Sequence, residues 1–164
     1  MVKGRFFLAR FLVFFLALCF LTGDNVAIMT EDIRWQQRFE NLTKAINRFH
    51  EALSGIAKEP NNHLYQIALI GAFQFTFELS WKTIKDYLVY NGVEVSLPRE
   101  VIKQAFHHQV IKDGQVWIDM LEDRNLMAHV YQEQAALAAG KSIRERYAPA
   151  IEQIYKDLLK KRKA

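Results

Sequence analysis

The stretch WIDMLEDRNLMAHVY, from Trp117 to Tyr131, decides how the rest of the chain is interpreted. Most of its apolar residues recur at steps of three and four, the spacing that marks the buried side of an amphipathic helix. These residues are Trp117, Met120, Leu121, Met127 and Ala128. Arg124 falls within the same stripe. A guanidinium stays charged at any accessible pH, so an apolar face holds it only where it meets an anion.

The anion that Arg124 meets has two candidate sources. An internal carboxylate is at hand, because Asp119, Glu122 and Asp123 lie close by in the sequence. In that case Arg124, Asp119 and Asp123 form an internal ion-pair network that needs no ligand. The other source is a phosphate group of a bound ligand, which a guanidinium holds well. Both hypotheses remain open at this point.

Two further polar residues, His129 and Tyr131, follow Arg124. On an unbroken helix with 3.6 residues per turn, Arg124 and Tyr131 share a face, whereas His129 lies roughly 140° away from Arg124. Joint action of Arg124 and His129 on one group therefore requires that the helix loosens near His129. The alternative is that the two side chains come from facing copies of a homodimer.

The remainder of the chain is predicted to be helical as well. It has 164 residues, of which 51% are hydrophobic and only 7 are Gly and 3 are Pro, so few turns are expected. The expected helices cover 31–57, 63–90, a short one near 96–107, one from 113 through the motif, and one after Tyr131 to the C-terminus. The sequence therefore predicts an all-α fold, an up-and-down four-helix bundle with one additional short helix.

The helix expected over 63–90 is apolar around most of its circumference. Ile67, Phe73, Phe75 and Phe77 do not share one face at helical spacing. A helix of this kind is either central in a bundle or buried in an interface.

Three expectations concern the short helix and the last one. Val101, Ile102 and Phe106 are expected to dock the short helix on the bundle. Gly140 continues the apolar stripe of the last helix, which predicts close packing against a neighbouring helix. Pro149 is expected to kink that helix, because its ring cannot complete the hydrogen-bond ladder.

Residues 1–28 differ from the rest of the chain. Three basic residues precede an apolar run over 11–21, as in a signal peptide, and this run is shorter than the roughly 20 residues of a membrane span. Alternatively, translation starts at Met29, and 1–28 comes from an upstream start codon or is an extension. We favour the second hypothesis, with 29–164 as a folded domain in the cytoplasm and away from membranes. A working signal would instead mean export.

Charge and cysteine content narrow the function classes. Three basic residues and one acidic residue lie in 1–28, so the folded part carries 19 basic and 17 acidic residues. Bulk charge therefore gives no independent support for nucleic-acid binding. The single Cys19 allows neither an internal disulfide nor a thiolate metal site. His107 and His108 are adjacent and point about 100° apart on a helix, so we expect no metal site and no cofactor.

A family resemblance rests on the motif and on the segments around it. RNLMAH at 124–129 resembles the R-x4-H motif of the HEPN superfamily (higher eukaryote and prokaryote nucleotide-binding). RNLMAHVY resembles the R-x4-H-x-Y form of the HepT toxins and the nucleotidyltransferase substrate-binding proteins. Further segments are similar to that branch, namely EDIRWQQRFENL at 31–42, FQFTFELSWKTIKDYL at 73–88, PREVIKQAF at 98–106, VWIDMLEDRN at 116–125 and RYAPA at 146–150. The likeness covers roughly Met29 to Leu159.

The resemblance implies RNA cleavage without a metal, by attack of a ribose 2′-hydroxyl on the adjacent phosphate. His129, with an ordinary pKa of about 6.5, would exchange protons with the 2′-hydroxyl or the leaving oxygen. Arg124 would neutralise the phosphate oxygens, and Asn125 would orient the phosphate or the imidazole. Homodimerisation would bring two motifs to one cleft.

The resemblance also implies a partner protein. In this second hypothesis the chain is a non-catalytic nucleotide- or protein-binding module that pairs with a small nucleotidyltransferase encoded nearby. In a toxin–antitoxin pair, Tyr131 would be the hydroxyl that the partner adenylylates (AMPylation), which would silence the site. The chain lacks a G-S-x-D-x-D signature, so it is not itself the transferase.

Gln74 and Glu78, one turn apart, complete the candidate site as supporting residues together with Asp119 and Asp123. Proteins of the resembling branch usually have Glu in place of Gln74, and Arg where this chain has Ala72. A simpler interpretation is that Gln74 is a hydrogen-bonded core residue.

Overall fold

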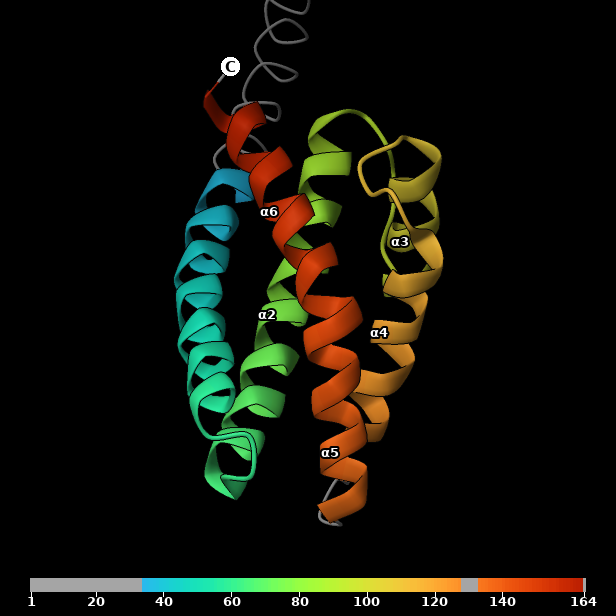
Figure 1. Ribbon diagram of the computed structural model, residues 1–164. Coiled ribbons are helices and arrows are strands. Elements are labelled where there is room, and N and C mark those ends of the chain that lie inside the picture. The colour runs from blue at the N-terminus through green and yellow to red at the C-terminus, as the bar shows by residue number, and fades with distance from the viewer. Residues whose placement is uncertain (1–33, 128–132, 164) are drawn as a thin grey trace, which may run out of the picture.

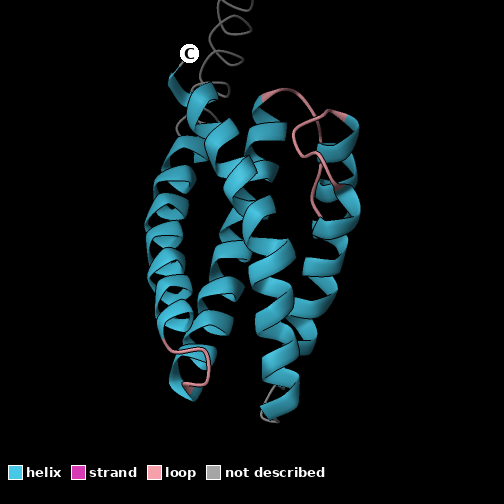
Figure 2. Cartoon of the chain, viewed as in Figure 1, coloured by secondary structure: helices cyan, strands magenta, loops and turns pink. Residues whose placement is uncertain are grey.

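The computed structural model describes residues 34–127 and 133–163, and within these two ranges the protein contains helices and no strand. A first helix covers residues 34–58. It is followed by α2 (His63–Tyr90), α3 (Pro98–His107), α4 (Gly114–Leu126), α5 (Glu133–Ser142), the π-helical turn η2 (Ile143–Tyr147) and α6 (Ala148–Lys163). The predicted all-α class is confirmed (Figure 2).

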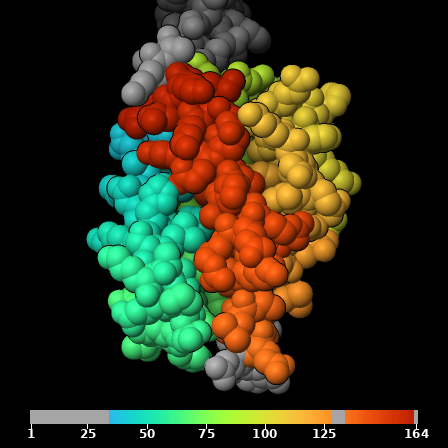
Figure 3. Space-filling view, in the orientation of Figure 1, coloured from blue at the N-terminus to red at the C-terminus, as the bar shows by residue number. Residues whose placement is uncertain are grey.

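Four long rods lie side by side, formed by the helix over 34–58, α2, α4 and the continuous run of α5, η2 and α6 (Figure 1). Successive long rods run in opposite directions, and the short α3 lies beside α4. In the space-filling view, α5 and α6 fill the space between the helix over 34–58 and α4 (Figure 3). This is the predicted bundle of four long helices and one short one.

Capping residues mark the helix boundaries. Asn62 precedes α2 and accepts a hydrogen bond from the Leu64 N–H at 3.0 Å. Gly92, with φ of 80°, follows the end of α2 in the left-handed conformation that glycine adopts readily. Asp113 caps α4 by accepting the Val116 N–H at 3.1 Å. Pro98 occupies the first position of α3, where a missing N–H costs nothing.

α2 is central, as one of the two predictions for it had stated, because it packs on α3, α5 and α6. Phe73 and Phe77 are fully buried, and the Phe73 ring stacks on Tyr147 with centroids 5.4 Å apart. The second possibility, burial in an interface, stays a prediction for one face of α2, where Ile67 is 54% exposed and Phe75 is 44% exposed. One side of α2 is therefore apolar and uncovered in the single chain.

The short helix docks through fewer residues than predicted. Val101 and Ile102 are buried, in agreement with the sequence. Phe106 is 53% exposed, so its expected docking into the bundle was wrong. Its ring instead lies over the first residue of α4, where a Cβ added to Gly114 would come within 3.1 Å of it.

The last rod stays helical through Pro149, and the irregularity lies in the turn before it. A proline ring clashes with the carbonyl four residues earlier, here that of Glu145, which belongs to the π-helical turn. Gly140 is buried, and a Cβ there would lie 4.0 Å from Leu69 of α2 and 3.3 Å from Arg144 Nη1. The predicted close packing against a neighbouring helix is therefore confirmed, and the neighbour is α2.

No helix in the described ranges is long and apolar enough to cross a membrane.

Candidate functional site

Only the first part of the motif, Arg124 and Asn125, belongs to α4. Arg124 and Asn125 occupy the last turn of this helix, which ends at Leu126. His129 and Tyr131 lie outside the described residues, so their predicted roles are untested. Helix geometry therefore fixes the direction of Arg124 and Asn125 alone.

Arg124 forms its ion pair with α2 and not with its own helix. Its Nη2 lies 3.0 Å from Glu78 Oε2, and its Nη1 donates a hydrogen bond to Asn125 Oδ1 at 3.1 Å. The predicted internal partners were wrong, and the supporting candidate Glu78 supplies the carboxylate. The side chain of Arg124 is also 39% exposed, so its predicted place in the buried stripe was wrong. The buried face of α4 carries Trp117 and Met120, and Arg124 lies at its edge.

Glu78 holds two cations at once. Its Oε1 accepts from Lys82 Nζ at 2.9 Å, one turn further along α2, while its Oε2 faces Arg124. Burial raises the pKa of the Glu78 carboxyl, but hydrogen bonds from Lys82 and Trp81 and the charges of Lys82 and Arg124 outweigh burial and leave the pKa below its usual value. Glu78 is therefore an anion that fixes Arg124 and leaves this cluster one positive charge in excess.

Asp119 and Asp123, one turn apart on α4, bind residues of η2 and not Arg124. Asp119 pairs with Arg146 and accepts from Gln115 Nε2 at 2.7 Å. Hydrogen bonds from Gln115 and Arg146 lower the pKa of Asp119. Asp123 accepts the hydroxyl of the buried Tyr147. Burial, reinforced by this hydrogen bond to Asp123, raises the pKa of Tyr147. These carboxylates thus hold α4 in place instead of neutralising Arg124.

The other two residues predicted near Arg124, Glu122 and Gln74, do not bond to it either. Glu122 pairs with Arg99 of α3 at 2.7 Å. Gln74 is half-buried, one turn before Glu78, and its side chain makes no hydrogen bond to any residue in 34–127 or 133–163. The interpretation of Gln74 as a hydrogen-bonded core residue therefore finds no bond in the described part of the chain.

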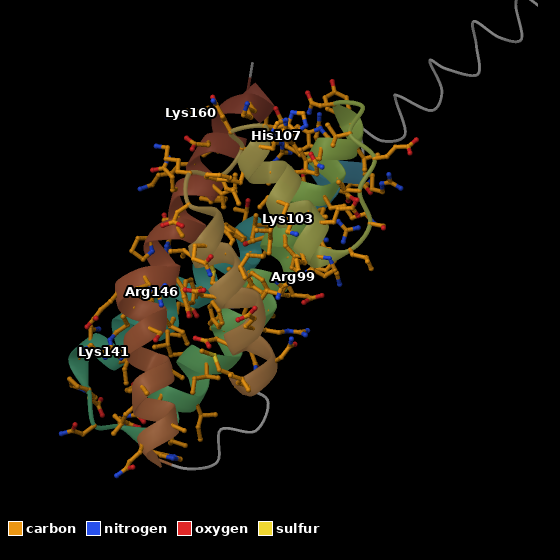
Figure 4. All side chains as sticks on the ribbon, turned by 90° about the vertical axis from the view of Figure 1, so that its right-hand side faces the viewer. Arg99, Lys103, His107, Lys141, Arg146 and Lys160 are labelled. Carbon is orange, nitrogen blue, oxygen red and sulfur yellow. The ribbon has the colours of Figure 1, made fainter. Side chains whose placement is uncertain are left out.

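Sequence reasoning missed Lys82, Arg146 and Tyr147. Lys82 carries a local signal, because it follows Glu78 by four residues, the spacing of helix ion pairs. Arg146, which is labelled in Figure 4, and Tyr147 are consecutive in η2, and each holds one of two carboxylates on α4. The RYAPA segment contains both residues but gives no local sign of their partners, which are 24 and 27 positions away.

A hollow of about 260 Å³ lies between the end of α4 and α5. Its walls are mainly apolar, and Asp123 brings one carboxylate to it. The lining residues are Asp123, Leu126, Met127, Ala135, Ala138, Ala139 and Ser142. Within the described ranges, no group of three or more His, Cys, Asp or Glu residues is placed to hold a metal ion.

The comparisons with known proteins agree with this arrangement of helices. Residues 37–160 match the model of a family described as "nucleotidyltransferase substrate binding protein like". The chain belongs to this family. A solved protein of Thermus thermophilus is 29% identical, with a TM-score of 0.59, and the match covers 67% of this chain and 98% of that one. No curated protein matches the chain. Membership supports a substrate-binding or partner role beside a nucleotidyltransferase.

Proposed function

We propose that the chain is the partner subunit of a small nucleotidyltransferase, of the HEPN toxin type, and that Arg124 and His129 cleave RNA without a metal. The observation that carries the proposal is the state of Arg124. Glu78 fixes its guanidinium, yet the group is 39% exposed at the end of α4, immediately before the rest of the motif. The guanidinium N–H groups beyond the two already bonded, including Nε–H, have no partner in the described part of the chain. They are available to a phosphate.

The chemistry follows from these donors. A ribose 2′-hydroxyl attacks the adjacent phosphorus and passes its proton to the His129 imidazole. The bond between phosphorus and the 5′ oxygen breaks, the 5′ oxygen takes a proton from the imidazolium, and a 2′,3′-cyclic phosphate remains. Arg124 faces the phosphate oxygens that gain charge during attack. Asn125 accepts from Arg124 through Oδ1, which leaves its amide N–H groups free to donate to the same phosphate.

Homodimerisation is part of the proposal, and the uncovered side of α2 supports it. Leu64, Ile67, Gly71, Phe75 and Glu78 follow one another at steps of three and four and share one helix face. The first three apolar side chains are 74%, 54% and 44% exposed, in the order Leu64, Ile67 and Phe75. No Asp, Glu, Lys or Arg occurs between residues 63 and 77, so two copies of this face meet without like-charge repulsion. Glu78 and Arg124 then lie at the edge of the dimer contact.

The test is cleavage of RNA by the purified chain. We expect His129→Ala to abolish cleavage and to leave the circular dichroism spectrum unchanged. His108→Ala, at an exposed histidine at the end of α3, is the matched control and should cleave like the wild type. Cleavage by His129→Ala at the wild-type rate would refute the catalytic role.

Tyr131 is proposed as the hydroxyl that the transferase adenylylates. The test is intact mass after incubation with the transferase and ATP, where the wild type should gain one or more AMP groups. Tyr131→Phe should gain none at this position and should still cleave RNA. A Tyr131→Phe protein that gains the same mass would reject Tyr131 as the acceptor.

A non-catalytic module remains the second candidate, because two features of this chain favour it. Arg124 already has a carboxylate partner in Glu78, and Ala72 stands where proteins of the resembling branch usually have Arg. Binding to the transferase without any RNA cleavage by the wild type would identify this second function.

We also propose that the working protein is the domain over 29–164 and that it meets RNA and transferase in the cytoplasm. Mass spectrometry of the native N-terminus tests this. A mature chain that begins shortly after Leu21 would contradict it and would indicate export.

A further inference from the structure

A second concave surface lies at the opposite end of α4 from Arg124. It is a groove of about 480 Å³ between α3 and the first turns of α4. Its lining residues are Ile102, Lys103, Phe106, Lys112, Asp113, Gly114, Gln115 and Ile118. Arg124 follows Gly114 by ten residues, which corresponds to about 15 Å along a helix. The groove is therefore separate from the candidate catalytic end.

Two contacts join the helices that form the groove. The ion pair between Arg99 and Glu122, at 2.7 Å, ties α3 to α4 beyond one end of it. At the other end the Phe106 ring lies against Gly114, where an added Cβ would come within 3.1 Å of the ring. A larger residue at Gly114 would push this ring away, so glycine allows the two helices to approach here.

The floor of the groove is apolar and partly open to solvent. Ile102, Ile118 and Phe106 line it, and Phe106 leaves 53% of its surface exposed. An exposed aromatic ring in a groove that branched aliphatic side chains also line is a typical anchor point for an apolar side chain of a partner.

The rim of the groove is positively charged. Lys103 and Lys112 are exposed, and neither forms an ion pair with any other residue in the described ranges. Along α3, Arg99, Lys103 and His107 recur every four residues and follow one another on one side (Figure 4). The one carboxylate of the groove, Asp113, caps α4 through the Val116 N–H. The rim therefore favours an anionic partner.

We propose that this groove docks a segment of a partner protein that places an apolar side chain between carboxylates. The proposal rests on the proposed pairing with a nucleotidyltransferase and assigns the docking surface of that pair. A protein segment fits better than RNA, because the groove is lined by two branched aliphatic residues and a single aromatic ring, and this ring already lies against Gly114. Docking at this end leaves Arg124 accessible while the partner is held.

The test is the affinity of the cognate nucleotidyltransferase for this chain, measured by isothermal titration calorimetry. Reversal of both rim charges, Lys103→Glu with Lys112→Glu, should weaken binding about 30-fold, and this loss should shrink as salt is raised. Phe106→Ala should weaken binding about tenfold through loss of the apolar contact. Circular dichroism establishes that each variant is folded.

Lys44→Glu is the matched control, because Lys44 is an exposed lysine on the helix over 34–58, away from α3. It should bind the transferase like the wild type. Equal affinity of the double reversal and the wild type, or an equal loss in Lys44→Glu, would overturn the groove while leaving the pairing intact. Absence of binding by the wild type would overturn the pairing and the groove together.

A second measurement, the binding of labelled single-stranded RNA to the same variants, distinguishes a protein occupant from a nucleic acid. If the double reversal lost RNA binding and kept its affinity for the transferase, the groove would be a nucleic-acid site and the proposed protein occupant would be wrong.

Discussion

Two carboxylates of α2, Asp86 and Glu78, each pair with an arginine of another helix, and the two pairs differ in how far they are exposed to solvent. Asp86 has a side chain that is 7% exposed, and it accepts from Arg38 Nε at 2.6 Å, across the contact with the helix over 34–58. Glu78, about two turns earlier, is 28% exposed and pairs with Arg124, which is itself 39% exposed. A carboxylate enclosed between helices needs its partner, whereas a half-open pair has room for a second anion. We therefore expect the Arg38–Asp86 pair to contribute mainly to the free energy of unfolding and the Arg124–Glu78 pair to contribute mainly to RNA cleavage.

The largest expected effect is on stability at the closed pair. Arg38→Ala should lower the free energy of unfolding by about 3 kcal/mol, because it leaves the buried Asp86 carboxylate with Arg34 at 3.9 Å. Arg124→Ala should cost at most about 1 kcal/mol, since Glu78 keeps Lys82. Urea denaturation measures both values. Equal losses in the two variants would remove the distinction between the pairs.

Catalysis should show the reverse order. Arg124→Ala is expected to slow RNA cleavage about 100-fold, equivalent to about 2.7 kcal/mol of transition-state stabilisation. Arg38→Ala should cleave at the wild-type rate at a temperature where it remains folded. Single-turnover rates on one RNA measure the difference, and a similar slowing in both variants would assign a merely structural role to Arg124.

Two glycines extend the comparison to smaller effects. Gly55 of the helix over 34–58 faces Tyr65 of α2, and Gly71 lies on the uncovered face of α2. A Cβ at Gly55 would lie 2.8 Å from the ring of Tyr65, so Gly55→Ala should destabilise by about 1–2 kcal/mol. A Cβ at Gly71 would meet nothing within 4 Å, so Gly71→Ala should stabilise the single chain by roughly 0.5–1 kcal/mol. Thermal unfolding at low protein concentration tests both. A stabilising Gly55→Ala would show that the closed side is loosely packed.

The support of α4 by the π-helical turn is expected to contribute about 1 kcal/mol. Tyr147→Phe removes the hydroxyl that Asp123 accepts and keeps the ring stacked on Phe73. Urea denaturation should show this loss, while Tyr155→Phe, whose ring stacks on Phe39, serves as the control. The same stability in Tyr147→Phe and the wild type would mean that this hydrogen bond is not stabilising.

The smallest expected effect is the pH dependence at Glu78. The pKa of this carboxyl is lowered on folding, so its contribution to stability is present above its unfolded value near 4.5 and is lost as pH falls through the lower folded value. The stability difference between the wild type and Glu78→Gln should therefore shrink between pH 6 and pH 3. A difference that grows on acidification would mean that the folded pKa is raised.

The sequence predicted what depends on local spacing and could not predict what depends on distant partners. Apolar stripes and the scarcity of glycine and proline predicted the helices, and the expected ranges 63–90 and 96–107 agree closely with α2 and α3. The apolar stripe misplaced Arg124, because spacing does not say which neighbouring helix supplies an anion. Glu78 lies 46 positions earlier, and only the packing of α4 on α2 brings the two together.

The candidate site was predicted in part for the same reason. Arg124, Asn125 and Glu78 meet as one cluster, whereas Asp119 and Asp123 bond to η2 on the other side of α4. Phe106 was expected inside because it is apolar, yet its position against Gly114 leaves it partly exposed in a groove between α3 and α4. Composition alone does not separate a core aromatic residue from a docking one.

The π-helical turn restricts how the length of this chain can change. Ile143, Tyr147 and Ile151 are all buried although they are four residues apart, and in a regular α-helix each such step drifts by about 40°. The wider turn absorbs this drift and keeps all three side chains inward. A π-helical turn holds one more residue than an α-helical turn, so deletion of a single residue between 143 and 147 restores a regular α-helix with Ile143 and Ile151 still on one face. Insertion of a residue there would instead rotate everything up to Lys163 by about 100° about the helix axis. Insertions are therefore expected to be tolerated in the connection over 59–62 and to fail in this segment.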